Sequence, residues 1–167
     1  MTVGANGIAT GELIIVLSLE SFKLLNPKIS RFDRGTGGTP EITFQEVSDC
    51  LATMSLPAAA WARLCYAMQW NYREQVFAYL AACLIKDKSI NGTKAPYWIG
   101  MLEMCIDSTL TETHLTNRTK AKALKLRWWT KNNEQHLQKC LYFLDQLDYE
   151  VRGAVTDWNK GRSVQDI

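Results

Sequence analysis

The sequence predicts an all-α protein, a helical bundle that contains a helix-turn-helix and follows an extended N-terminal arm. After residue 40, apolar residues recur at helical spacing, and no alternating strand pattern of useful length is present. Six of the ten glycines precede that point, and the stretch RFDRGTGGTP (residues 31–40) is typical of a flexible linker. We therefore assign residues 1–40 to an N-terminal arm and linker, and residues 41–167 to a helical domain.

Composition indicates an ordinary globular chain without a membrane partner. Of its 167 residues, 47% are hydrophobic and 22% are charged, and the formal net charge is only +2. The five cysteines are scattered and form no CxxC pair, which argues against a disulfide framework and a zinc site and favours a reducing, cytoplasmic setting. The apolar run Leu13 to Leu19 is too short to span a bilayer.

The first two helices of the domain begin at recognisable start signals. Thr43 and Glu46 have the spacing of a capping box, in which each side chain bonds the other residue's backbone N–H, so a helix is predicted from there to about Met54. Pro57 suits the first turn of a helix, and residues 58–70 follow with strong helix formers.

Two further helices are predicted in the middle of the chain. Asn71 and Glu74 form a second cap signature, and residues 91–92 (Asn-Gly) end the helix that follows. Pro96 opens another helix that continues to about Ile106. The earlier of the two carries an apolar stripe at helical spacing: Val76, Phe77, Leu80, Cys83 and Leu84.

A helix-turn-helix is predicted at about residues 117–150. The first, short helix covers residues 117–124, and a longer helix runs from Arg127 to about Val151 or beyond. The face predicted to be buried on the longer helix comprises Trp129, Leu137, Cys140, Leu141, Leu144 and Leu147. In the short helix, Ala121 is the small residue that the motif needs against its partner. Leu124 and Leu126 fall where the motif has its two core anchors, and Lys125 lies between them, where many such motifs have glycine.

This motif is locally basic, which indicates double-stranded DNA as the partner. Residues 118–137 contain six basic residues and one acid. Basic residues of the first helix suit phosphate contacts, and Arg, Lys, Asn and Gln on the second can pair with guanine or adenine edges. The candidate DNA-binding residues are Arg118, Lys120, Lys122, Lys125, Arg127, Trp128, Lys131, Asn132 and Gln135.

Each of these assignments has a simpler alternative. A solvated basic face on an ordinary helical hairpin has the same charge pattern. Trp128 is either a half-buried packing residue or a base wedge or stacking platform.

No catalytic, cofactor or metal site is predicted. His114 and His136 lack a carboxylate or cysteine at the spacing of metal ligands or of a nucleophile. There is no phosphate loop, nucleophile elbow or HExxH sequence. The acids around the first cap, Glu41, Glu46 and Asp49, are expected from the helix macrodipole alone. An enzyme is therefore not expected.

The segment covering residues 17–55 resembles the opening of the late-gene antiterminators of lambdoid phages, the Q antitermination proteins. The shared features are Leu19-Glu20-Ser21 and Lys23, then Asn26-Pro27-Lys28, a polar stretch, and a Thr-led helix beginning with residues 42–47. Residues 121–147 are similar in style to the helix-turn-helix of smaller phage antiterminators. Because well-known members with this N-terminus carry CxxC zinc ligands, the resemblance implies a zinc-free branch.

The resemblance implies a bacteriophage transcription factor that acts in the host bacterial cytoplasm. Such a protein binds DNA near a late promoter, associates with the bacterial RNA polymerase holoenzyme and permits read-through of terminators. The segment from Leu19 to Arg34 and the exposed side of the first helices would then be available to polymerase. Two other functions remain open: a helix-turn-helix repressor or activator, and a helical adaptor that binds a host protein. The sequence leaves the oligomeric state open.

Overall fold

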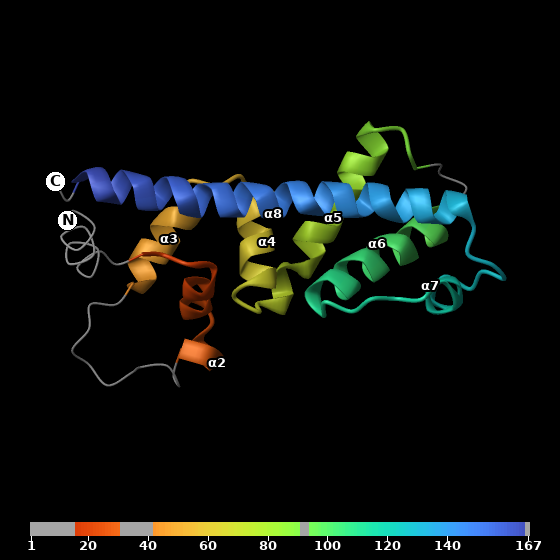
Figure 1. The fold of residues 1–167 in the computed structure, drawn as a ribbon, viewed down its shortest axis with the longest axis horizontal. Helices are drawn as coiled ribbons and strands as arrows, with labels where there is room; N and C mark the ends of the chain where they lie inside the picture. The colour runs from red at the N-terminus through yellow and green to blue at the C-terminus, as the bar shows by residue number, and fades with distance from the viewer. Residues whose placement is uncertain (1–15, 31–41, 91–93, 166–167) are drawn as a thin grey trace, which may run out of the picture. The chain divides into compact units, whose positions relative to one another are not determined.

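The computed structural model describes residues 16–30, 42–90 and 94–165, and all regular structure in these ranges is helical (Figure 1). The all-α prediction is thus confirmed. None of the described helices is both long and apolar enough to cross a membrane. The elements are η1 (Leu19–Leu25), α2 (Pro27–Ser30), α3 (Phe44–Ala52), α4 (Leu56–Cys65), η2 (Trp70–Tyr72), α5 (Arg73–Lys86), α6 (Ala95–Leu110), α7 (Asn117–Ala123) and α8 (Lys131–Gln165).

The chain divides into two compact units, and α8 contributes to both. One unit comprises residues 1–70 and 150–167, and the other comprises residues 71–149. The candidate interface lies in the second unit, which contains α5, α6, α7 and the first part of α8.

In the first unit, part of the predicted irregular arm is folded, so the prediction is wrong for residues 16–30. Helix η1 contacts α3 and α4 and buries Phe22 completely, and Leu17 is only 1% exposed. The Asn159 side chain of α8 accepts a hydrogen bond from the Leu17 N–H (3.0 Å) and donates one to its carbonyl (2.9 Å). Burial of a few apolar residues orders this short segment. The predicted linker at residues 31–40 lies outside the described residues.

The two helices that follow are started by side-chain caps. Thr43 Oγ1 accepts from the Glu46 N–H (3.2 Å), and Glu46 Oε2 accepts from the Thr43 N–H (2.7 Å), which confirms the capping box. Ser55 caps α4, whose first turn contains Pro57 as predicted. The α4 helix ends at Cys65, five residues before the predicted end at residue 70.

The second unit has an apolar core formed on the predicted stripes. On α5 and α8 the buried residues are Val76, Leu80, Leu84, Leu137, Cys140, Leu144 and Leu147, whereas Phe77, Cys83 and Leu141 are half-buried. The α5 helix is preceded by the 3₁₀ turn η2, so its N-cap is Tyr72 and not the predicted Asn71. The Arg73 guanidinium, 2.9 Å from Asp107 Oδ1, links α5 to α6.

Helices α5, α6 and α7 end in the same way, although glycine is absent from all three ends. Lys88, Glu112 and Lys125 have positive φ values of 60°, 52° and 56°. In each case the N–H of the next residue bonds a carbonyl five residues earlier, for example Leu126 N–H to the Ala121 carbonyl at 2.8 Å. These are Schellman motifs, which usually have glycine at the left-handed position because a side chain there is strained.

Candidate nucleic-acid interface

The first helix of the basic segment, α7, is short and held against α6 by small residues. Thr116 Oγ1 accepts from the Thr119 N–H (3.2 Å) and caps the start of α7. Ala121 is 6% exposed, which confirms the predicted need for a small residue. On α6, a Cβ added to Gly100 would lie 2.4 Å from the Leu124 side chain, so a larger residue there would require Leu124 to shift. The α6–α7 packing therefore places the chain that follows α7.

The segment after α7 is a seven-residue connection, residues 124–130, and not the tight turn of the predicted motif. Lys125 occupies the left-handed position at the end of α7, which agrees with its predicted place in the turn. The second helix, α8, starts at Lys131 and not at Arg127, so the predicted start is wrong. Arg127 and Trp128 consequently belong to the connection, and Trp128 does not share a helical face with Lys131.

The reason for the late start of α8 is a cap at Thr130. Asn133 Oδ1 accepts hydrogen bonds from the Thr130 N–H and hydroxyl, both at 2.8 Å. Thr130 Oγ1 in turn accepts from the Asn133 N–H at 3.3 Å. This reciprocal pair has the arrangement of a capping box with asparagine in place of Glu or Gln. The Thr-x-x-Asn spacing in the sequence was the signal that could have located it.

Trp129 and Lys120 serve the structure of the connection instead of the roles predicted for them. The indole N–H of Trp129 donates to Glu134 Oε2 at 2.6 Å, and this fixes the residue before the cap to the first turn of α8. Lys120 Nζ lies 3.1 Å from the same carboxylate oxygen, with its side chain 12% exposed, and 5.6 Å from the Trp129 ring centroid. Trp129 is thus half-buried outside the helix, and Lys120 is not available for phosphate contact.

Glu134 is the acceptor that holds these groups together. Burial raises the pKa of its carboxyl, but hydrogen bonds from Trp129, Lys120 and Gln138 lower it by more, so the net pKa lies below the usual value. The carboxylate is therefore charged at neutral pH and neutralises Lys120. The single acid of the basic segment is thus paired internally, and the remaining cations keep an excess of positive charge at the surface.

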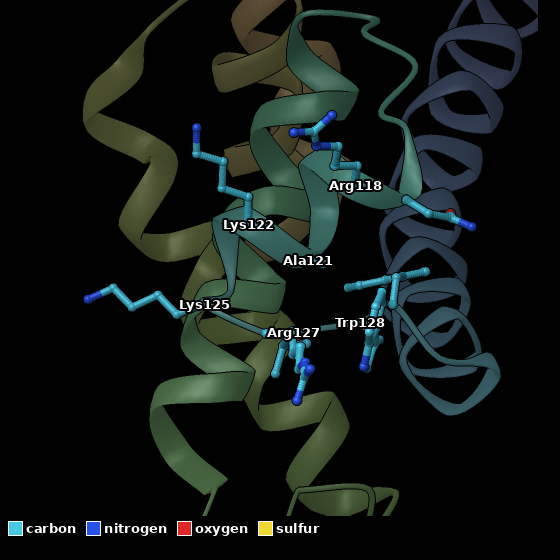
Figure 2. Close-up of a pocket in the computed structure, with 9 residues that line it drawn as sticks. Arg118, Ala121, Lys122, Lys125, Arg127 and Trp128 are labelled. Carbon is cyan, nitrogen blue, oxygen red and sulfur yellow. The ribbon is translucent and has the colours of Figure 1, made fainter.

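Those cations surround an open groove of about 770 Å³ (Figure 2). Arg118 and Lys122 come from α7, and Figure 2 shows Lys125 extending outward from the turn that follows. All the cations that line the groove are exposed, and within the described ranges none takes part in an ion pair. The lining is completed by neutral and apolar residues, so the full set is Asn117, Arg118, Ala121, Lys122, Lys125, Leu126, Arg127, Trp128 and Trp129.

Trp128 forms a ridge at the edge of this groove. It is 70% exposed, and the Arg127 guanidinium carbon lies 5.5 Å from its ring centroid. A second hollow, of about 490 Å³, shares Leu126, Arg127 and Trp128 with the first. The predicted base-reading residue Asn132 lines this second hollow, whereas Lys131 and Gln135 are exposed on the first turns of α8 and line neither.

A hydrogen-bonded chain at the floor of the second hollow was not predicted. Asn133 Nδ2 donates to the Tyr97 hydroxyl (2.9 Å), which lies 2.8 Å from His136 Nδ1. Burial raises the pKa of Tyr97 despite the Asn133 bond, and burial together with the charges of Lys94 and Lys139 lowers the pKa of His136. This bond occupies His136 Nδ1, and the tautomer of the imidazole sets which of the two groups donates. Only the fold brings Tyr97 to this place, 36 residues before Asn133.

Three of the five cysteines, Cys50, Cys105 and Cys140, are buried. Burial raises the pKa of Cys50 to about 11 and that of Cys140 to about 12, and it also raises the pKa of Cys105. Such thiols remain protonated and unreactive at neutral pH. No group of three metal-ligating side chains is found among the residues that the structure describes.

Comparison with known proteins gave no match to any family model, curated protein or solved structure. The likeness of residues 17–55 to phage antiterminators therefore stays a prediction.

Proposed function

We propose that this protein binds double-stranded DNA through the basic groove and acts as a phage transcription antitermination factor together with bacterial RNA polymerase. The observation that carries the DNA-binding part is a set of four exposed cations on one groove that form no ion pair with the residues the structure describes: Arg118, Lys122, Lys125 and Arg127. Exposed cations that no neighbouring acid neutralises release condensed counterions when they contact phosphates.

The small net charge of the chain, +2, supports a DNA-binding surface that is confined to one region of the protein. A protein whose positive charge is distributed over its whole surface binds nucleic acid at many places. In this chain, the excess of basic over acidic residues is concentrated between α7 and α8. Lys131 and Asn132 lie on the first turn of α8, where Asn132 lines the second hollow, and both side chains are suited to base edges. The antitermination part rests on the sequence resemblance alone.

DNA binding is tested by its salt dependence. Each lost phosphate contact should make the negative slope of log K against log salt shallower by about 0.9 for duplex DNA. We expect Lys122→Ala to produce this decrease, measured by fluorescence anisotropy with a labelled duplex at several salt concentrations. Lys160→Ala, an exposed lysine on the other unit, is the matched control and should leave the slope unchanged. Equal slopes for the wild type, Lys122→Ala and Lys160→Ala would refute the assignment of the groove as the DNA-binding surface.

Antitermination is tested by transcription in vitro with bacterial RNA polymerase holoenzyme. Selection from a library of genomic fragments first identifies a bound DNA site. Templates with and without that site, each followed by a terminator, then separate the functions. Site-dependent lengthening of transcripts supports antitermination, and site-specific binding without read-through identifies a repressor or activator instead. Absence of DNA binding at low salt would favour a protein partner for the basic surface.

A further inference from the structure

The ridge formed by Trp128 has an unusual combination of exposure and surroundings. A tryptophan that is 70% exposed leaves most of its apolar ring in water, yet the residue sits between two hollows in a strongly basic segment. Its neighbour Trp129 is fixed by Glu134, so the backbone beside Trp128 is held in place. Arg127 lies over the Trp128 ring and adds a flat, positively charged guanidinium group to the ridge.

The hollow beyond the ridge is lined by groups that can recognise the edge of a base. Asn133 and Tyr97 bond each other, and His136 Nδ1 is occupied, so these groups form a fixed floor. Lys94, Arg127 and the Asn132 amide also line the hollow, and each can offer an N–H donor to a ligand. A lining dominated by donors favours an acceptor-rich edge such as that of guanine.

We propose that Trp128 stacks on an unpaired DNA base that enters the second hollow, while the adjacent strand follows the basic groove. The inference rests on the proposed DNA binding and deepens it, since it predicts that the protein prefers a locally melted duplex to a fully paired one. A paired base cannot reach the hollow because its faces are covered by its neighbours in the stack. Aromatic side chains stack with any unpaired base, and cations beside them hold the backbone.

The test compares three labelled DNAs of the same sequence: a paired duplex, a duplex with a central bubble, and the single strand. Binding is measured by fluorescence anisotropy for the wild-type protein, Trp128→Ala and Trp128→Phe. Trp70→Ala is the matched control, because Trp70 is also exposed (62%) but lies on the other unit. Thermal unfolding followed by circular dichroism checks that each variant is folded.

We expect the bubble to bind more tightly than the duplex. Trp128→Ala should lose about 5- to 150-fold in affinity for the bubble and for the single strand, which both offer unpaired bases, and should bind the paired duplex as the wild type does. Trp128→Phe should retain most of the affinity, and Trp70→Ala all of it. Equal binding of bubble and duplex, or an equal loss on both with Trp128→Ala, would overturn the stacking proposal and leave duplex binding intact. Binding to none of the three DNAs would overturn both proposals.

Discussion

Replacement of Lys125 by glycine separates its structural effect from its proposed contact with DNA. With φ at 56°, the lysine Cβ is held close to a carbonyl oxygen, a strain of about 1–2 kcal/mol that glycine does not have. Glycine also gives the unfolded chain about 0.4–1 kcal/mol more conformational entropy, which opposes the gain. The net expectation for Lys125→Gly is a stabilisation of about 1 kcal/mol.

The DNA affinity should change in the opposite direction. Because Lys125 lines the basic groove, its loss removes one phosphate contact and makes the negative salt slope shallower by about 0.9. Urea unfolding measures the stability, and salt-dependent anisotropy measures the binding. A stability gain of this size corresponds to a rise in melting temperature of about 2–4 °C for a chain of this length.

The chain contains a matched control for this experiment. Lys88 ends α5 in the same Schellman motif with φ at 60°, but it lines neither groove. Lys88→Gly should therefore stabilise the protein without changing DNA binding. A loss of stability in Lys125→Gly would refute the left-handed conformation, and unchanged DNA binding would remove Lys125 from the interface.

Two further predictions concern the elements that support the interface. Gly100→Ala should destabilise the protein by about 1 kcal/mol in urea unfolding, since crowding of Leu124 exceeds the gain in helix propensity. Gly153 has free space around it, so Gly153→Ala should instead stabilise the protein by about 1 kcal/mol. Equal effects of the two substitutions would contradict the close approach of Leu124 to Gly100. The lowered pKa of His136 favours its neutral form in the fold, so its contribution to stability is full above about pH 6.5 and is lost as pH falls through the folded-state pKa. Unfolding curves between about pH 5 and 7.5 should show that the wild type loses stability toward low pH and that His136→Gln loses less. The same pH dependence in both proteins would show that another group is responsible.

Local sequence signals accounted for most of the helices. The capping box at Thr43 and the proline near the start of α6 depend on residues three or fewer positions apart, so they can be seen in the sequence. The burial of the α8 stripe followed from helical periodicity, which a continuous helix must obey. Errors occurred where two local signals competed, as at Thr130, whose cap with Asn133 starts α8 later than the basic Arg127 suggested.

The concentration of positive charge between residues 118 and 131 was determined by the sequence itself, because charge is a property of composition. Which of those cations face water was decided by tertiary contacts: Lys120 is paired with Glu134, fourteen residues away, while Lys122 and Lys125 remain exposed. The hollow beside Trp128 likewise depends on Tyr97, which only the packing of α6 against α8 brings to Asn133. Such contacts join residues far apart in the chain, and no short-range pattern encodes them.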